Sequence, residues 1–502
     1  MIPIFSSLNM MQRALEVAQE AIQTTGHNVS NANTEGYSRQ RVNLSAATPY
    51  PAIGINADRG AGQVGTGVNA DSVVRIRDRF VDLQVRDNTN QNGYWSAVSD
   101  AYSQMEDIIN EPTDTGISAV LDNFWQSLQD LAGNSGTSGT GTVVLQNGAE
   151  VADTFNYLSL SLGKVQDNLN QQITENVGLI NNYSDQINEL NKEINAQEAN
   201  GLLANDLYDQ RDALTEKLAQ LVPIQVTTTK SGGNPSALAE GLYTIEIVDK
   251  NGASFSPAAT LVDGTGLTNN HLQRTPSDNP NVTLNMTAAD DKTPAGPASL
   301  GHLSGKLQGL IDAYTIDFSE VTDSLNHMAD TLAENFNQVY AQNAGYDGTK
   351  GTFFIGDSAD PAHSGTVTAA NIHVNANLTG EAVLSNEKGS PSGDNTGAQN
   401  MADVIAVNTY AVDGTTSTPV TLKNYLQGLI GRIGVNAQSA QQFTDNSNAL
   451  LQAAKNRQSS VSGVSMDEEL TNLIQYQHTY ESAARVVTTL DSLLDTLINK
   501  MS

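Results

Sequence analysis

Apolar residues near the start of the chain recur every three or four positions. The repeat runs through Met1, Ile4, Leu8, Met11, Leu15, Ala18 and Ile22. This alternation puts the side chains on one face of a helix, as in the seam of a coiled coil. Pro3 suits the start of the helix and Gly26 suits its end, which predicts a helix about 33 Å long. Alone, such a helix is marginal in water, because nothing covers its apolar face.

The C-terminal segment carries the same pattern, with a second apolar stripe beside the first. The main seam consists of Leu473, Tyr476, Tyr480, Ala483, Val487, Leu490, Leu494, Leu497 and Met501. Ser465 and Glu468 have the spacing of a capping box and predict a helix start there. The second stripe consists of Ile474, Val486, Leu493 and Ile498. A helix with two apolar stripes requires more than one neighbour.

These terminal seams allow two interpretations. The two helices pair with each other within one chain, or they pair with copies of themselves in a polymer. In the second case we expect the ends of the monomer to be mobile before assembly, because their apolar faces then lack a permanent partner.

The middle of the chain begins with helical patterns. Residues 71–222 are mostly helical, and their heptad seam is interrupted by Asn176. This seam consists of Ile173, Ile180, Tyr183, Ile187, Leu190 and Ile194. The next helix ends before Pro223 and carries Leu207, Leu214, Leu218 and Leu221. The run from Gly133 to Gly141 is rich in Gly, Ser and Thr, which is typical of a flexible joint.

Strand patterns begin at Pro223. Apolar residues alternate at 224–226, 243–247 and 282–286, and short strand patterns occur at 353–355 and 372–374. Asn251-Gly252 is a hairpin signal. Helical patterns return at 303–343, 399–410 and 421–456. The predicted fold is mainly α: an elongated helical bundle with coiled-coil-like paired terminal helices and inserted β-rich domains.

Composition and charge narrow the range of functions. The 502 residues include 25 Lys plus Arg and 55 Asp plus Glu, a net charge of −30. This excess of carboxylates argues against nucleic acid and against an anionic membrane as partners, since both bind clustered cations. The chain has no cysteine, which excludes disulfides and thiolate metal sites. We find no cleaved signal peptide and no membrane-spanning stretch, so we expect a cytoplasmic protein or export by a route without a cleaved signal.

No motif predicts catalysis, a cofactor or a metal ion. Gly60, Gly62 and Gly65 have the spacing of a dinucleotide-binding loop, but no strand and helix flank them as such a loop requires. Gly305-Lys306 lacks the upstream glycine and the following hydroxyl of a phosphate-binding loop. Among the seven histidines no two are three to five residues apart, which argues against metal ligation.

Two charged clusters favour a structural role. The denser one consists of Asp206, Asp209, Arg211 and Asp212. Their spacing alone would allow these carboxylates to act in acid–base catalysis. We expect instead that Asn205 or Asp206 caps a helix and that Arg211 ties that turn. The other consists of Arg75, Arg77, Arg79 and Arg86. This stripe predicts salt bridges between domains or between subunits.

The segment from Thr25 to Gln40 is rich in asparagine and ends in Gly-Tyr-Ser-Arg-Gln. It resembles the turn shared by rod, hook and hook-associated proteins of the bacterial flagellum. The residues that carry the resemblance are Asn28, Asn31, Asn33, Gly36, Tyr37 and Arg39. The Tyr-Ser-Arg-Gln ending, Asn-Asp-Leu-Tyr-Asp-Gln-Arg-Asp at 205–212 and Ser-Gly-Val-Ser-Met-Asp-Glu-Glu at 462–469 are most similar to the hook-associated protein 1 family. The β insertions match nothing in that resemblance.

The resemblance implies a structural, non-enzymatic subunit that joins the flagellar hook to the filament. It implies type III export without a cleaved signal, an extracellular location in the flagellum, and polymerisation through the terminal helices. The implied partners are other copies in a ring-like homo-oligomer, the hook protein, a second junction protein next to the filament, and a cytoplasmic export chaperone at the C-terminal helix. The implied assembly seam consists of Ile4, Leu8, Met11, Leu15, Ile22, Leu473, Tyr476, Tyr480, Val487, Leu490, Leu494 and Leu497.

Four predicted domains follow from these patterns. Residues 1–50 and 460–502 form an inner terminal-helix domain, and 223–299 and 346–397 form a β-rich insertion domain and a smaller β-rich insertion. The helical bundle comprises 51–222, 300–345 and 398–459. Two alternatives stay open: a flagellin-type filament subunit, and an adhesin or enzyme whose activity resides in the β insertions.

Overall fold

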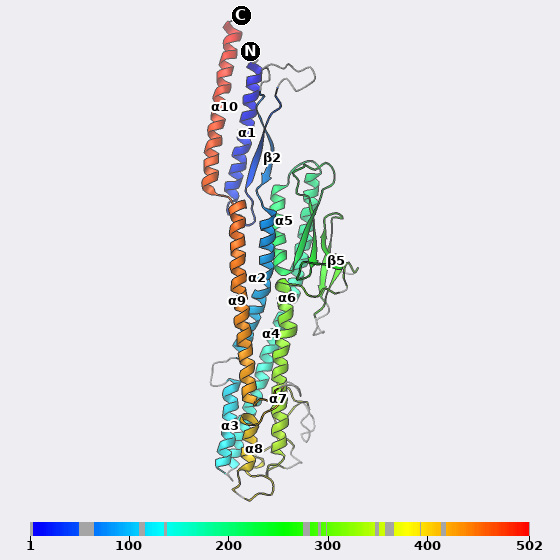
Figure 1. Ribbon diagram of the computed structural model, residues 1–502, viewed down its shortest axis with the longest axis vertical. Coiled ribbons are helices and arrows are strands. Elements are labelled where there is room, and N and C mark those ends of the chain that lie inside the picture. Colours follow the sequence, from blue (N-terminus) through cyan, green and yellow to red (C-terminus); the bar gives the residue numbers. More distant parts are fainter. Residues whose placement is uncertain are drawn as a thin grey trace.

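The computed structural model is an elongated molecule in which the paired terminal helices project from one end of a long helical body (Figure 1). It describes residues 4–49, 65–109, 116–134, 138–274, 282–289, 293–297, 299–346, 351–356, 366–391, 393–412 and 418–500. Gly60 and Gly62 lie outside these ranges. Among the described residues, no helix is both long enough and apolar enough to cross a membrane.

The two terminal helices pack against each other within the chain. Helix α1 (Ile4–Asn31) lies beside α10 (Met466–Lys500), and a two-stranded hairpin of β1 (Gln40–Ala46) and β2 (Val68–Arg75) packs on α1. The terminal helices therefore pair with each other within one chain, which is the first of the two interpretations of their seams. The hairpin was not predicted, and β2 lies in a segment that the sequence had assigned to the bundle.

The helical body extends away from this hairpin. Its helices are α2 (Arg79–Ile109), α3 (Ile117–Gly133), α4 (Ser138–Glu198), α5 (Asn205–Leu221), α6 (Gly305–Asp312), α7 (Phe318–Tyr340), α8 (Thr396–Ala406) and α9 (Leu422–Ser462), with a π-helical turn at Ala313–Asp317 between α6 and α7. The 61 residues of α4 span about 90 Å. Ile173, Ile180 and Ile187 are fully buried in its core, so the predicted heptad seam of α4 is confirmed.

The β insertion is one antiparallel sheet that packs beside α4. Its strands follow in chain order: β3 (Ile224–Thr229), β4 (Leu242–Val248), β5 (Ser254–Asp263), β6 (Thr268–Arg274) and β7 (Leu284–Ala288). The predicted strands correspond to β3, β4 and β7, and Asn251-Gly252 lies in the β4–β5 turn. A second, two-stranded sheet of β8 (Phe354–Ile355) and β9 (His373–Val374) lies at the other end of the body.

Asparagine side chains on α4 hold the sheet in place. Asn181 Nδ2 donates to the carbonyl oxygen of Leu272 at 2.9 Å, and its Oδ1 accepts from the Leu272 N–H at 2.7 Å. Asn191 forms the same two bonds with Tyr243, at 2.8 and 3.1 Å. Each amide therefore takes the place of a neighbouring strand and satisfies buried backbone groups of β6 or β4.

One glycine prediction was wrong, and another covered too long a segment, of which residues 135–137 lie outside the described ones. Helix α1 does not end at Gly26 but continues to Asn31, and the chain turns at Gly36, whose φ is +80°. A glycine inside a helix costs about 1 kcal/mol relative to alanine, which the tertiary contacts of the last turn of α1 outweigh. The Gly133–Gly141 run is not one joint, because α3 extends to Gly133 and α4 already begins at Ser138.

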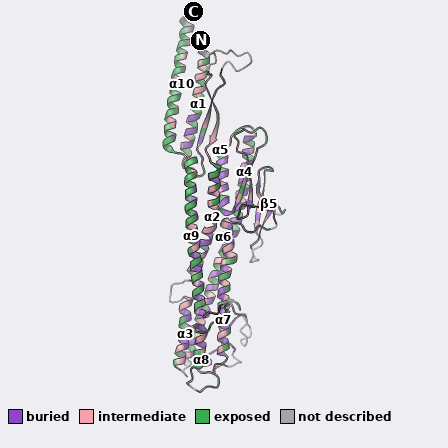
Figure 2. Ribbon diagram, in the orientation of Figure 1, coloured by how far each residue is buried: buried purple, intermediate pink, exposed green. Residues whose placement is uncertain are grey.

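The mainly α fold class, with its elongated bundle, paired terminal helices and small antiparallel sheets, is confirmed. Figure 2 shows that buried residues line the contacts within the body, whereas α10 and the adjoining part of α9 are largely exposed. The described part of the chain therefore keeps most of its uncovered helix surface near the end where the terminal helices lie.

The close packing of α2 at Gly93 yields a first prediction. A Cβ at position 93 would overlap the backbone carbonyl of Gln220, whereas a Cβ at Gly163, inside α4, meets nothing. We expect Gly93→Ala to lower the free energy of unfolding by about 1–3 kcal/mol through overpacking. Gly163→Ala should raise it by about 0.5–1 kcal/mol, since alanine is the better helix former. Urea denaturation of both variants tests this; equal effects would contradict the described packing.

Candidate functional site

The asparagine-rich turn connects α1, β1 and α10 through one amide. The Gln40 N–H donates to Asn28 Oδ1 at 2.9 Å, and Asn28 Nδ2 donates back to the Gln40 carbonyl at 2.9 Å. The same Nδ2 donates to Glu469 Oε2 at 3.0 Å, and the Tyr37 hydroxyl donates to Asn28 Oδ1 at 2.8 Å. Asn28 is almost fully buried. Its role is therefore to join the end of α1 to the start of β1 and to the first turn of α10.

Arg39 reinforces this junction by binding the first turn of α10. Its Nε lies 2.7 Å from Glu469 Oε1 and its Nη1 lies 3.0 Å from Glu468 Oε2. The Arg39 N–H also donates to the Ser462 carbonyl at 2.8 Å. The acidic first turn of α10 thus serves two purposes: it favours the helix start, and it binds a guanidinium from the asparagine-rich turn.

The other residues of the turn shape its loop. Asn31 Nδ2 donates to the His27 carbonyl at 3.1 Å and its Oδ1 accepts from the Thr34 hydroxyl, whereas Asn33 is exposed. Gly36 has a positive φ, and a Cβ there would lie 3.0 Å from Ala213 Cβ on α5. Glycine at 36 therefore meets both the backbone conformation and the close approach to α5.

A buried ion-pair network joins the hairpin to the body. Arg75 Nη1 lies 2.6 Å from Asp209 Oδ1 and 3.0 Å from Asp212 Oδ2, and its Nη2 lies 2.6 Å from Glu240 Oε2. Arg77 Nη1 lies 3.1 Å from Asp212 Oδ2. The side chain of Arg75 is only 2% exposed. Two of the four arginines of the basic stripe therefore form ion pairs between the hairpin, α5 and the β insertion.

Further contacts complete the network. Arg77 Nη2 pairs with Asp82 of α2 at 2.9 Å, so the network includes a second body helix. Ser38 donates to Asp209 through its hydroxyl at 2.6 Å and through its N–H at 3.0 Å. The residues of the turn, the hairpin, α2 and α5 thus share one set of carboxylates.

Arg211 has a different role from the one predicted. It is fully buried and does not tie its own turn: Nη1 donates to the Gly241 carbonyl at 2.7 Å, and the guanidinium lies 3.5 Å from the ring centroid of Tyr243. The Tyr243 hydroxyl donates to Asp212 Oδ1 at 2.7 Å. Arg211 therefore attaches α5 to the β insertion by a cation–π contact and a charged hydrogen bond.

The predicted capping role of Asn205 or Asp206 was also wrong. Ala204 occupies the N-cap position of α5 and makes no side-chain cap bond. Asn205 Nδ2 instead donates to the Val73 carbonyl at 2.8 Å, and Asp206 Oδ1 accepts from Gln40 Nε2 at 2.9 Å. Both side chains bind the hairpin, because β1 and β2 lie close enough to compete with the free N–H groups of the helix end.

Comparison with known proteins identifies the family. The chain is 38% identical to "Flagellar hook-associated protein 1" of Bacillus subtilis, over 99% of this chain and 98% of that protein. It is 26% identical to the protein of the same name in Salmonella typhimurium and 25% identical to that in Escherichia coli, each over 98% of this chain and 99% of the relative. This chain belongs to the flagellar hook-associated protein 1 family.

Two family profiles and one solved structure agree with this assignment. "Flagellar hook-associated protein FlgK helical domain" matches residues 102–354, and "Flagellar basal body rod FlgEFG protein C-terminal" matches residues 455–500. The first match runs through the β insertion, for which the sequence alone had offered no counterpart. The structure of the flagellar hook junction protein FlgK from Burkholderia pseudomallei covers 76% of this chain at 16% identity, with a TM-score of 0.59, and shows the same fold.

The terminal seam of this family member is half-covered. Residues on both helices are half-buried where α1 meets α10: Leu8, Met11, Leu15, Ile22, Leu473, Tyr476, Val487, Leu490 and Leu494. Tyr480 is more open, with 41% of its surface exposed, and its place in the assembly seam stays a prediction. Ile4 and Leu497 lie in the helices, but their side chains are outside the described ones.

The second stripe of α10 is left uncovered by the residues that the structure describes. Ile474 is 54% exposed and Leu493 is 50% exposed, and Val486 and Leu470 are similarly open. The sequence predicted that a helix with two stripes requires a second neighbour, and the described part of the chain supplies only α1. The stripe is thus an apolar surface that the described part of the chain leaves uncovered.

The charged clusters of the described residues are not arranged as a metal site. Among the described residues, no group of three or more His, Asp or Glu side chains is arranged to hold a metal ion. Asp209 and Asp212, two carboxylates of the charged cluster on α5, face arginines. What this arrangement can do chemically is bind and orient protein segments.

Burial and the neighbouring charges shift the pKa values of the groups in the ion-pair network. Burial opposes the charge of Asp212, but Arg77, Arg75 and Arg211 outweigh burial and hold the pKa of Asp212 at about 2. Burial, followed by the charge of Asp212, raises the pKa of Tyr243 to about 12. For Asp209 burial is the largest effect and raises the pKa above its usual value, against Arg75 and Ser38. Asp212 is therefore the carboxylate whose ionised form the arginines favour most clearly.

These pKa shifts predict acid sensitivity. Asp212 has a depressed folded-state pKa, so its stabilisation is present above its ordinary pKa of 3.8 and is lost as the pH falls towards 2. We expect this carboxylate to account for about 2 kcal/mol of the acid-induced fall in the free energy of unfolding. Asp212→Asn should destabilise the protein at neutral pH and should remove this part of the slope.

Urea denaturation across this pH range measures the slope for each variant. Asp122→Asn is the matched control, because Asp122 forms an exposed pair with Lys423 at 2.7 Å and such pairs contribute little. An acid slope that is equally steep in the Asp212→Asn variant and in the unmodified chain would contradict the assignment.

Proposed function

We propose that this chain is a structural subunit of the bacterial flagellum that joins the hook to the filament. The observation that carries the proposal is full-length similarity to relatives named flagellar hook-associated protein 1. A protein of the same fold, titled a flagellar hook junction protein, supports it. The role is structural rather than catalytic, since the buried polar groups join segments of the chain.

In this proposal the subunits polymerise through their terminal helices. The α1–α10 pair projects beyond the body (Figure 1), and its exposed stripe on α10 becomes covered when copies pack around a common axis. The rigid junction formed by Asn28, Arg39 and Arg75 holds this pair at a fixed angle to the body. Neighbouring subunits therefore meet pre-oriented surfaces, which lowers the entropy cost of association.

The proposed partners follow from the position at a junction. The subunits form a ring-like homo-oligomer with the hook protein on one side and a second junction protein, next to the filament, on the other. Export by the flagellar type III route, without a cleaved signal, brings the chain to the extracellular flagellum. Before export, a cytoplasmic chaperone covers α10, whose apolar stripe is otherwise an aggregation hazard.

The junction role is tested by deleting the chain from its host. We expect electron microscopy to show bare hooks, and flagellin to be found in the medium, because filament subunits have nothing to attach to. A plasmid-borne copy of the full chain should restore attached filaments. Intact filaments in the deletion strain would refute the role and would favour flagellin redundancy or an activity of the β insertion.

The exposed stripe of α10 can be tested without disturbing the monomer. Leu493→Asp places a charge on a half-exposed side chain, so the monomer should fold normally, but burial of the charge on assembly should cost several kcal/mol per interface. Ser492→Asp, one position away and exposed, is the control and should assemble. We measure filament attachment and the circular dichroism of the purified chain. Attached filaments with Leu493→Asp would show that the second stripe of α10 is not buried in the assembly.

Substitutions on the α1-facing side test the predicted seam. Leu490 and Leu494 are half-buried, so Leu490→Asp or Leu494→Asp should block assembly while the body stays folded. These variants should also loosen the α1–α10 pair, because the new charge lies between the two helices. Normal filaments built from either variant would disprove the seam.

A further inference from the structure

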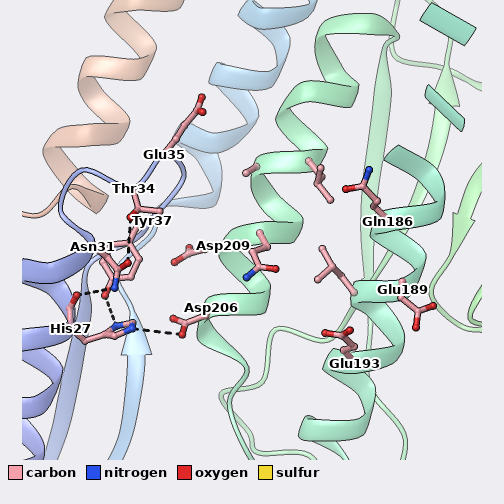
Figure 3. Close-up of a pocket in the computed structure, with 14 residues that line it drawn as sticks. His27, Asn31, Thr34, Glu35, Tyr37, Gln186, Glu189, Glu193, Asp206 and Asp209 are labelled. Carbon is pink, nitrogen blue, oxygen red and sulfur yellow. Dashed lines mark hydrogen bonds and ion pairs between the residues drawn. The ribbon is translucent and has the colours of Figure 1, made fainter. Parts of the chain in front are cut away.

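An open groove lies between the asparagine-rich turn and the helices α4 and α5. It has a volume of about 590 Å³. Figure 3 shows His27 and Tyr37 on one side of it and Glu189 and Glu193 of α4 on the other, with Asp206 of α5 between them. Because its walls come from the terminal domain and from the body, the groove exists only while the ion-pair network holds the two together.

The groove combines an acidic rim with an apolar floor. The rim carries the carboxylates of Glu35, Glu189, Glu193 and Asp206, and the floor consists of Leu190, Ala213 and Leu214. Lys192 pairs with Glu189 at 3.1 Å and His27 Nε2 lies 3.7 Å from Asp206. At neutral pH these contacts leave a negative rim whose members are mostly exposed. Such a groove fits an apolar segment that carries a cation.

A matching ridge runs along α9. It consists of Phe443, Leu450, Arg457 and Val461, spaced by seven, seven and four residues, which places them on one face of the helix. Phe443 is 49% exposed and Leu450 is 48% exposed. Phe443 is held by a stacked contact with Trp95, with ring centroids 4.4 Å apart. Arg457 is exposed and forms no ion pair with any residue that the structure describes.

The Arg457 end of the ridge lies level with one end of the groove, and Phe443 lies farther along the body, beside Trp95 of α2. Gln458 Nε2 donates to Glu216 Oε1 of α5 at 2.9 Å, so this part of α9 is level with the end of the groove at Ala213 and Leu214. Arg457 is one residue from Gln458 and therefore projects about 100° away from α5 around the helix. The ridge consequently does not face α5, which forms part of the groove of its own chain.

We propose that the α9 ridge of one copy inserts into the acidic groove of the next copy. This inference rests on the proposed function, since it supposes subunits side by side around an axis. The ridge and the groove are different surfaces that face in different directions and overlap in level near Arg457. A contact between such surfaces is heterologous and can repeat around a ring. The apolar ridge covers the floor of the groove, and Arg457 pairs with Glu193 and its neighbouring carboxylates at the rim.

The absence of cysteine from the chain makes a direct test possible. Full-length chain carrying both Glu193→Cys and Arg457→Cys is expressed in the deletion strain, and isolated flagella are oxidised with copper phenanthroline. We expect a ladder of disulfide-linked multimers, because each copy then offers one thiol to each neighbour. Either substitution alone should give no dimer. Glu193→Cys combined with Lys455→Cys is the matched control, since Lys455 lies about 200° around α9 from Arg457.

The outcomes separate this contact from the junction role itself. Attached filaments without a ladder would overturn the contact and leave the junction role standing. Dimers from Arg457→Cys alone would indicate an isologous contact, and an adduct with a different protein would indicate another occupant; both would refute the proposal. Bare hooks with flagellin in the medium in the deletion strain test the junction role separately.

Charge reversal gives an independent check. Arg457→Glu places a carboxylate against the acidic rim and should weaken association of the subunits by at least about tenfold. Combining Arg457→Glu with Glu193→Arg should restore most of the loss, whereas Lys455→Glu should have little effect. We score the fraction of hooks that carry filaments. Failure of the double variant to exceed Arg457→Glu alone would contradict the pairing of position 457 with position 193.

Discussion

The structure depends on the burial of Arg75 and Arg77 among carboxylates from several segments. Removing two guanidinium groups from water is costly, and the cost is offset only if every charge finds a partner in good geometry. Asp209, Asp212 and Glu240 meet that condition together. Because these partners belong to α5 and the segment before β4, the hairpin can dock in one orientation only. A loosened junction would leave buried charges unpaired, so the terminal domain cannot pivot freely on the body.

Asparagine supplies a second, uncharged constraint of the same kind. Asn28, Asn181 and Asn191 each bond both the N–H and the carbonyl of one backbone residue, and Asn343 does so with Leu384. A side-chain amide offers one donor group and one acceptor in the geometry of a peptide. It can therefore complete an exposed strand edge where no strand is available. This explains how a chain poor in charged residues still orients its β segments on its helices.

Sequence patterns predicted the local helices but not the contacts between segments that are far apart in the chain. Heptad spacing revealed α1, α10 and the buried isoleucines of α4, because periodicity needs only neighbouring residues. It could not reveal that Arg75 meets Asp209, 134 positions away, or that Asn28 meets Glu469, 441 positions away. The hairpin was missed because its strands contain many polar residues and are not joined by a short turn. The charged motif at 205–212 was visible, but its partners were not, so capping was the wrong local explanation.

The two constraints together determine which surfaces remain for partners. Once the network and the amide bonds fix the body, the hairpin and the terminal helices relative to one another, uncovered apolar side chains on α9 and α10 cannot rotate inwards to find cover within the chain. Leu450 and Leu493 are about half exposed for this reason. An assembly that buries them gains apolar area without the additional cost of ordering a flexible chain. A monomer that holds uncovered apolar faces in a fixed arrangement is therefore suited to burying them in an assembly.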